Sequence, residues 1–555
     1  MQSTRQPVHL DISPRPGAQG NDFRPQVRLE WLSFLETTPF VSVLLLLPAV
    51  FTLAPVPIDE TRYLAVAWEM RRATEFLVPH LNGQWYADKP PLLFWLINLG
   101  WSLTGVHAWS ARLVTLLCSI LSLVLIGRIC LRLELGQQGA RLAQWMFVGT
   151  LYFALFANAI MFDVLLTSCV LAALLGLLQI EAGEHRRGIW AMGVAIGAGI
   201  LAKGPVMLLD IGFAMALVPW WSVRARNRWR AFFGTLGCAV VLGIAIALAW
   251  AIPAGIDGGP DYARALFLHQ TFDRMTSSFA HGRPMWWYAM ILPIMLLPWT
   301  LALRGSPETW RFLWQSKACR FALAWMIPTL VVFCLINGKQ PHYLLPLLPA
   351  VAVVGATLVA HGECRISSGA VALLMLAAGG LLAAMPWIAS RRVWLAPYAS
   401  ISPSWGFSLC AVAIALMLMR QRARSVAVLA LASLIAIDLA ESAFARPIGD
   451  HNDVTPVAEM IRDAQTRGQL IAHIGWHNGL YEFAGRLQMP LQAIRPSELR
   501  AWCEQHPDGL VVAMDGDLQL DAVPVYSKPF RDARASVWRA SDAINAHLVD
   551  IRPTD

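Results

Sequence analysis

Long apolar runs recur along most of the chain, and they constrain its fold more than any other feature of the sequence. Of the 555 residues, 56% are hydrophobic and only 14% are charged, whereas soluble globular proteins carry about 25% charged residues. Only helices and closed barrels satisfy every backbone polar group inside a bilayer, and a spanning helix needs about 20 apolar residues. The sequence therefore predicts a polytopic α-helical membrane protein.

The runs predict about thirteen membrane spans. They are residues 39–57, 109–130, 142–157, 162–180, 189–203, 205–221, 231–252, 286–303, 321–336, 343–360, 370–388, 405–419 and 425–441. The fifth and sixth form one run that is interrupted at Lys203-Gly204-Pro205, where proline prevents the helix from continuing. Residues 1–35 are polar and lack the apolar core of a signal peptide, so we expect residues 1–38 to form a cytoplasmic tail.

The distribution of arginine and lysine predicts the orientation, because short cytoplasmic loops collect these residues. With the N-terminus inside, every second connection is basic, and Arg391 and Arg392 on the other side are the exception. The basic connections hold Arg128, Arg132 and Arg141; Arg186 and Arg187; Arg224, Arg226, Arg228 and Arg230; Arg304, Arg311, Lys317 and Arg320; Arg365; and Arg420, Arg422 and Arg424.

Two segments outside the spans have structure of their own. In the outer loops, residues 61–76, 90–104 and 262–278 are amphipathic or apolar but short, which predicts juxtamembrane helices along the surface. Residues 447–555 are polar and alternate strand-like with helix-like runs, which predicts a small α/β domain. Because the number of spans is odd, this domain is expected on the outer side. The predicted domains are therefore the tail 1–38, a transmembrane domain 39–446 and the outer domain.

Carboxylates at the outer membrane edge are the first candidates for chemistry. Asp59 and Glu60 directly follow the first span, and Asp163 lies in an almost wholly apolar neighbourhood. Ionisable groups at membrane depth are costly and mark functional sites. We interpret all three as candidate catalytic residues, with Asp59 acting as a general base or ordering a sugar hydroxyl. The alternatives are a solvated acidic pair for the first two and a helix N-cap for Asp163.

Cations on the same side indicate an anionic ligand. Lys89, Lys203 and Lys339 are three of only five lysines, and they lie on the outer edge against the general charge trend. Lysine binds phosphate as a point charge and Arg62 could bind it bidentately. We therefore expect Arg62, Lys89 and Lys203 to hold a phosphate, with Tyr343 adding a hydrogen bond. Snorkelling of the lysines to the interface is the alternative.

Four further residues are possible substrate contacts: His269, Arg274, Lys339 and His342. An interfacial aromatic belt is the alternative explanation for Tyr343. The nine cysteines are scattered and show no metal-ligand spacing, so no metal site is predicted. Carboxylates and cations beside lipid suit a substrate with a lipid tail and a phosphorylated head, because cations would stabilise charge on a phosphate leaving group.

The motifs resemble a known family, the bacterial aminoarabinose transferases that modify lipid A, which are related to the protein O-mannosyltransferases. DETRY after the first span, VPHLNG and DKPPLLFW resemble the first periplasmic loop of that family. MFDVLLT, LAKGP, the run from His269 to Arg274, RPMWWYAMILP and GKQPHYLLP follow in the same order. The resemblance covers the whole chain.

The resemblance implies the C-type glycosyltransferase fold and transfer, with inversion, of a sugar from an undecaprenyl-phosphate carrier to lipid A or another periplasmic acceptor at the inner membrane. The sugar would be 4-amino-4-deoxy-L-arabinose, and neither a nucleotide sugar nor a metal or other cofactor would take part. Family members commonly have Glu at the position of Asp88 and K-L-P-T-Y where this chain has Lys339 to Tyr343. These departures leave sugar and acceptor open.

Two other classes of function remain open at this stage. A flippase or transporter of lipid-linked sugars would be expected to show internal repeats and polar groups at the middle of the membrane. A glycan polymerase or ligase, or a transferase of the same fold acting on a protein, would use a different first loop or acceptor. The chain shows no obvious repeat, and its charges gather at one edge.

Overall fold

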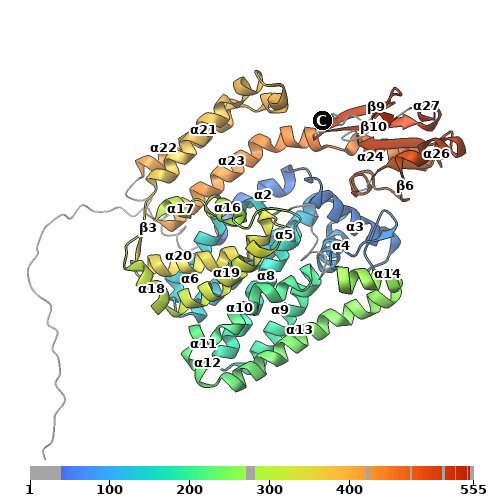
Figure 1. Cartoon of the computed structure of the whole chain (residues 1–555). Coiled ribbons are helices and arrows are strands. Elements are labelled where there is room, and N and C mark those ends of the chain that lie inside the picture. The colour runs from blue at the N-terminus through green and yellow to red at the C-terminus, as the bar shows by residue number, and fades with distance from the viewer. Residues whose placement is uncertain are drawn as a thin grey trace, which may run out of the picture.

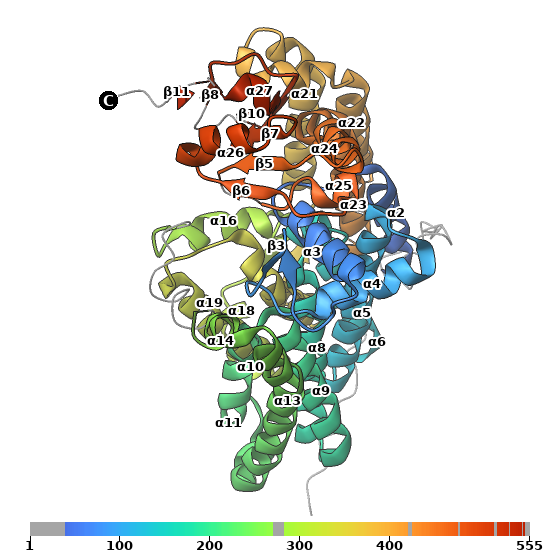
Figure 2. The same ribbon diagram turned by 90° about the vertical axis from the view of Figure 1, so that its right-hand side faces the viewer.

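A computed structural model describes residues 39–269, 282–419, 425–475, 478–514, 519–531, 533–544, 546 and 548–549. A bundle of helices forms the larger part, and a small mixed domain at the C-terminal end lies beside it (Figure 1). The first outer loop packs where the two parts meet (Figure 2).

Seven helices of the described residues are long and apolar enough to cross a membrane, or up to eight if one bent pair is a single span. The chain is therefore a multi-pass membrane protein. The seven are α5 (Ala108–Arg132), α8 (Phe162–Glu181), α13 (Trp229–Asp257), α19 (Lys317–Leu335), the continuous pair of η4 (Pro341–Leu347) and α20 (Leu348–Ala360), α21 (Gly369–Ala389) and α23 (Val426–Asn452) with its extension; the bent pair is η5 (Val393–Ser400) with α22 (Pro403–Leu418).

The predicted count of thirteen stays a prediction because several apolar runs form short or broken helices. The run 142–157 is divided between α6 (Gly136–Val148) and α7 (Leu151–Phe156), and the run 286–303 between α16 (Trp287–Met295) and α17 (Trp299–Ala302). Other short apolar helices are η1 (Pro39–Ser42) with α2 (Val43–Thr52), α4 (Leu92–Thr104) and α10 (Val206–Ala216).

Helix α8 is the most enclosed of the spans and packs against α5, α10, η4 and α9 (His185–Lys203). The face of α9 that points away from α8 packs closely against α13 (Trp229–Asp257). A methyl group on Gly193 would lie 2.6 Å from Leu242, and one on Gly197 would lie 2.7 Å from Ile246. Small residues of this kind let membrane helices approach closely, so α8, α9 and α13 form a tight stack.

Different charged contacts occur at the two ends of the bundle. At one end, Lys317 lies 3.0 Å from Glu181, and the strands β3 (Leu303–Gly305) and β4 (Cys364–Ile366) pair antiparallel. These segments all belong to the predicted inner connections. At the other end, the ion pairs join Glu60 to Arg112 and Lys203 to Asp163, all from the predicted outer edge.

The first outer loop forms α3 (Asp59–Ala73), a hairpin of β1 (His80–Leu81) and β2 (Gln84–Trp85), and α4. Two of the predicted surface helices are thus present with slightly different bounds. The third prediction, 262–278, begins in α14 (Gly259–Arg264) and η2 (Ala265–His269) and continues outside the described residues.

The C-terminal part contains a five-stranded sheet in the order β6-β5-β7-β10-β9. The central strand β7 (Leu510–Met514) is parallel to β5 (Ile471–Ile474) and antiparallel to β10 (Ala533–Arg539); the edge strands are β6 (Gln492–Ile494) and β9 (Tyr526–Phe530). Helices α24 (Thr455–Thr466), α25 (Glu482–Gly485) and α26 (Leu499–Gln505) complete it. The last spanning helix, α23, runs through the predicted boundary at 447 to Asn452.

This domain docks on the first outer loop. The Trp68 indole donates a hydrogen bond to the Leu487 carbonyl at 3.0 Å, and the Asn82 amide exchanges two hydrogen bonds with the Leu491 backbone at 2.7 and 2.9 Å. Gly479 has a φ of +72°, and a methyl group there would lie 3.4 Å from Cα of Arg62. The domain therefore contacts the helix that carries Asp59 and Arg62.

Candidate active site at the outer end of the bundle

The start of α3 is anchored by Glu60. Its carboxylate accepts hydrogen bonds from the backbone N–H groups of Val56 at 2.7 Å and Ile160 at 2.8 Å, and it pairs with Arg112 of α5 at 2.6 Å. Both side chains are almost completely buried. Because both oxygens of Glu60 are occupied by the protein itself, this geometry favours a structural role over the catalytic role predicted from the sequence.

Asp59, one residue earlier, has a different environment. Its carboxylate accepts hydrogen bonds from Arg62 at 3.2 Å and from the Tyr63 hydroxyl at 3.4 Å, and its side chain remains 43% exposed. Burial, and next the charge of Asp59, raise the pKa of Tyr63 well above its usual range, so the hydroxyl keeps its proton. Asp59 is thus a fixed carboxylate that a ligand can reach.

The second half of the site comes from α8, α9 and η4. Asp163, in the first turn of α8, accepts a short hydrogen bond from Lys203 at the end of α9. The His342 Nε2 lies 3.9 Å from the other oxygen of Asp163. The ammonium of Lys203 also lies over the ring of Tyr343, 4.3 Å from its centroid. The structure therefore brings together Asp163, Lys203, His342 and Tyr343, which are far apart in the sequence.

Aromatic rings connect the two halves. Phe162 packs edge-on against Tyr63 of α3, with ring centroids 4.9 Å apart, and the Lys89 ammonium lies 5.8 Å from the centroid of the Phe162 ring. Lys89 is also close enough to Asp163 for their charges to interact. Asp59, Arg62, Lys89 and the Asp163 cluster consequently line one region at the predicted outer end.

Lys339 has a different position from the other predicted cations. It is 1% exposed, and its ammonium donates hydrogen bonds to the backbone carbonyls of Arg283 and Ile336. These bonds fasten the segment after the undescribed residues to the end of α19, which favours a structural role over substrate contact. The side chain of His269, and all of Arg274, lie outside the described residues.

Sequence reasoning missed two buried charged residues. Arg112 is an arginine inside an apolar run, and this position was a signal that a buried partner such as Glu60 exists. Asp210 of α10 is 1% exposed, and neither carboxylate oxygen has a hydrogen-bond partner. It lies close enough to Lys203 and Asp163 for their charges to interact. In the sequence, Asp210 could have been noticed as a lone carboxylate within the apolar run VMLLDIGFAMA.

Fold and site together define a class: a polytopic helical membrane protein with carboxylates and cations gathered at one end of its bundle. Within the part of the chain that the structure describes, no three His, Cys, Asp or Glu side chains form a group that could hold a metal ion. Comparisons with known proteins define this class more narrowly. Residues 88–250 match the family described as dolichyl-phosphate-mannose-protein mannosyltransferase.

Curated relatives are undecaprenyl phosphate-α-4-amino-4-deoxy-L-arabinose arabinosyl transferases. The enzyme from Edwardsiella ictaluri is 30% identical over 344 residues, which are 59% of this chain and 61% of the relative. Transferase 1 from Pseudomonas fluorescens is 32% identical over 319 residues, 56% of this chain and 57% of the relative. The chain thus matches about three fifths of the length of these relatives.

The crystal structure of ArnT from Cupriavidus metallidurans bound to undecaprenyl phosphate superimposes with a TM-score of 0.74 at 19% identity, covering 93% of this chain and 99% of that one. The same protein in the apo state also gives 0.74. The chain therefore has the ArnT fold. The resemblance to aminoarabinose transferases that its motifs indicated is confirmed.

Proposed function

We propose that this chain is a glycosyltransferase that moves a sugar from an undecaprenyl-phosphate carrier to lipid A or another periplasmic acceptor. The proposed sugar is 4-amino-4-deoxy-L-arabinose, and the proposed location is the bacterial inner membrane. One observation carries the proposal: Asp59 with Arg62, and Asp163 with Lys203, converge at one end of a bundle with the ArnT fold. The names of the curated relatives support the choice of carrier and sugar.

The reaction is a displacement at the anomeric carbon of the sugar. An oxygen of the acceptor forms the new bond to this carbon, the bond to the carrier's phosphate oxygen breaks, and the phosphate leaves with the electron pair. Negative charge therefore grows on the leaving phosphate, where preorganised cations give the largest stabilisation. Arg62, Lys89 and Lys203 would provide that charge, and Tyr343 a hydrogen bond.

Asp59 would meet the acceptor and the sugar. A phosphate of lipid A is already anionic at neutral pH and needs no base, whereas a hydroxyl acceptor would need one. The position of Asp59 suits either acceptor, because its carboxylate is accessible yet held by Arg62 and Tyr63. Asp163 would act as a positioning residue, since it fixes the ammonium of Lys203 beside the ring of Tyr343.

The topology belongs to the same proposal. If the shorter helices complete crossings, the chain spans the membrane thirteen times with its N-terminus in the cytoplasm. Asp59, Asp163 and the C-terminal domain then share the periplasmic side. Support comes from the charged contacts, since Lys317–Glu181 joins two predicted inner segments and Asp163–Lys203 two predicted outer ones. Reporter enzymes that are active only in the periplasm, fused after residue 258 and after residue 306, should be active only at the first position.

The function is tested in a bacterial strain that lacks its own aminoarabinose transferase but still makes the donor. Expression of this chain should add the mass of a pentose amine to lipid A in mass spectra, and Asp59→Asn, expressed at the same level, should not. An unchanged lipid A with the wild-type chain would remove lipid A as the acceptor. A full mass gain with Asp59→Asn would contradict the role assigned to Asp59.

A further inference from the structure

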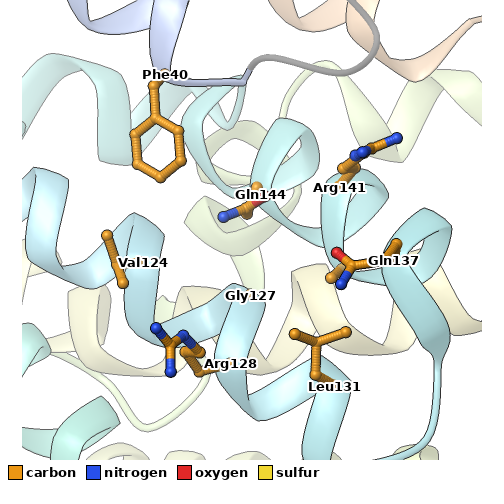
Figure 3. A pocket seen from close by; sticks show the side chains of 9 residues that line it. Phe40, Val124, Gly127, Arg128, Leu131, Gln137, Arg141 and Gln144 are labelled. Carbon is orange, nitrogen blue, oxygen red and sulfur yellow. The ribbon is translucent and has the colours of Figure 1, made fainter.

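A cavity lined by polar and apolar side chains lies at the opposite end of the bundle from the candidate active site. It encloses about 300 Å³ between α5, α6 and η1. Figure 3 shows Arg128 of α5 and Arg141 of α6 on opposite sides of this cavity. Arg128 is 16 residues along α5 from Arg112, which separates them by about 24 Å at 1.5 Å per residue. The cavity is therefore separate from the site described above.

The two arginines, Arg128 and Arg141, have no carboxylate partner among the residues that the structure describes. This contrasts with Arg132, one turn further along α5, which pairs with Glu184. Two guanidinium groups beside one cavity attract an anion, and guanidinium matches phosphate by bidentate hydrogen bonding.

The cavity also has a fixed polar wall. Gln144 is 9% exposed, and its amide nitrogen donates a hydrogen bond of 2.9 Å to the Leu123 carbonyl. A methyl group on Gly127 would lie 2.7 Å from that nitrogen, so glycine at this position leaves room for the amide. Gln137 lines the cavity as well (Figure 3). Polar groups held in place in this way can orient a headgroup.

Apolar side chains complete the lining and decide between a soluble and a lipid ligand. Phe40, Val124 and Leu131 line the same cavity, and Phe40 and Leu131 are 41% and 37% exposed. They sit on helices that cross or enter the membrane, so these exposed faces would meet acyl chains. A soluble phosphate would use only the arginines, whereas a phospholipid would use both parts of the lining.

We propose that this cavity binds the headgroup of an anionic phospholipid, with its phosphate between Arg128 and Arg141 and its acyl chain along Phe40 and Val124. Basic pockets between membrane helices commonly hold anionic headgroups. Each arginine near the surface of an anionic membrane contributes about 1 kcal/mol to binding. Replacing both arginines should therefore weaken binding roughly 30-fold. Such a lipid would brace α5 against α6.

The test uses the purified full-length protein and native mass spectrometry, with phosphatidylglycerol as the probe. We expect saturable binding of one phosphatidylglycerol that is weakened roughly 30-fold in Arg128→Gln/Arg141→Gln. Arg186→Gln/Arg187→Gln is the matched control, because these exposed arginines begin α9 at the same end of the bundle and do not line the cavity. Its affinity should stay within about threefold of the wild type, a margin of less than one arginine contact.

Each of the following results would overturn the proposal. Equal binding of net-neutral phosphatidylcholine would remove the role of charge, and equal losses in both double variants would indicate diffuse surface attraction. Competition by inorganic phosphate at millimolar concentration would indicate a soluble ligand.

If the glutamine pair does not fold, Arg128→Lys/Arg141→Lys keeps the charge and should lose only a few-fold in affinity for phosphatidylglycerol. As an independent readout, a photoreactive benzoylphenylalanine at Leu131 should crosslink to phospholipid; a crosslink to residues 1–38 instead would contradict the proposed occupant.

Discussion

Asp163 and Lys203 form a buried ion pair across α8 and α9, with His342 beside Asp163 and the Lys203 ammonium over the Tyr343 ring. Their side chains are 3% and 9% exposed. A lone charge of either kind would be costly at this depth, so each residue explains the presence of the other. The pair also places one lysine at the end of the bundle where the carrier's phosphate is proposed to bind.

Breaking this pair should be worse for the fold than removing it entirely. Lys203→Met or Asp163→Asn alone leaves one buried charge without its partner, which typically costs about 3–5 kcal/mol. The double variant should recover much of that loss. Thermal unfolding of the three purified variants measures this difference, and additive losses in the double variant would show that the two side chains are not energetically coupled. Activity should stay low in all three, because the lysine proposed to bind the carrier's phosphate, or the carboxylate proposed to position it, is missing.

Glu60→Gln separates structure from chemistry. The amide cannot neutralise buried Arg112 and cannot accept from both Val56 and Ile160 as the carboxylate does, so we expect a loss of about 3–5 kcal/mol in the free energy of unfolding. The fraction that folds should keep most of its activity per molecule. Stability is read from thermal unfolding, and the active fraction from transfer per folded protein. A stable but inactive variant would restore a catalytic role for Glu60.

Asp210→Asn tests the carboxylate that sequence reasoning missed. Because neither oxygen of Asp210 has a hydrogen-bond partner, the amide should fold as well as the wild type, with a melting temperature that is unchanged or higher. Affinity for the carrier phosphate is measured on the same variant, and a changed affinity with an unchanged fold would assign Asp210 a role in positioning Lys203. A melting temperature lowered by several degrees would instead reveal a contact that the acid makes and the amide cannot.

Glu69 should make the outer loop sensitive to pH. Burial raises the pKa of this α3 carboxyl, although its hydrogen bond from Gly83 at 2.7 Å and the nearby Arg72 act against the shift. A raised pKa in the folded protein means that the protonated form is favoured there. This contribution to stability is present at low pH and is lost as the pH rises through the folded-state pKa.

Hydrogen exchange at the β1–β2 hairpin measures this effect. Protection of the wild type should increase as the pH falls from neutral toward 5, after correction for the intrinsic exchange rate. Glu69→Gln should show protection that depends less on pH, because glutamine does not titrate in this range. The same pH dependence in both proteins would assign the effect to another group.

The sequence predicted the site better than it predicted individual roles. Charge alternation placed Asp59, Asp163 and Lys203 on one side, and the structure brings these residues to one end of the bundle. The roles of Asp59 and Glu60 were not separable, because successive helix residues point about 100° apart and only tertiary packing determines which one faces Arg112. Local sequence gave no sign of the carbonyls that bind Lys339, since one of them belongs to Arg283, far away along the chain.

Helix lengths were also hard to predict. Apolar composition marks the run 286–303 as membrane material, but it does not show that the run divides into α16 and α17. Pro293 and Pro298 lie in this run, and each removes a backbone donor and disturbs helix geometry. Apolar composition therefore marks a run as membrane material without showing whether it forms one continuous helix.

The most direct test of the account is sugar transfer by the purified protein from a polyprenyl-phosphate donor, compared between the wild type and Asp59→Asn. The Asp59 side chain is accessible, whereas Glu60 is buried in an ion pair with Arg112. The fold should therefore tolerate a change at Asp59 better than one at Glu60. We predict transfer by the wild type, a fall in kcat of about 100-fold or more if Asp59 acts as a base and about tenfold if it only orients the reactants, and carrier binding within about threefold. Transfer by Asp59→Asn at the wild-type rate, or no transfer by the wild type with any polyprenyl-phosphate sugar, would contradict the account.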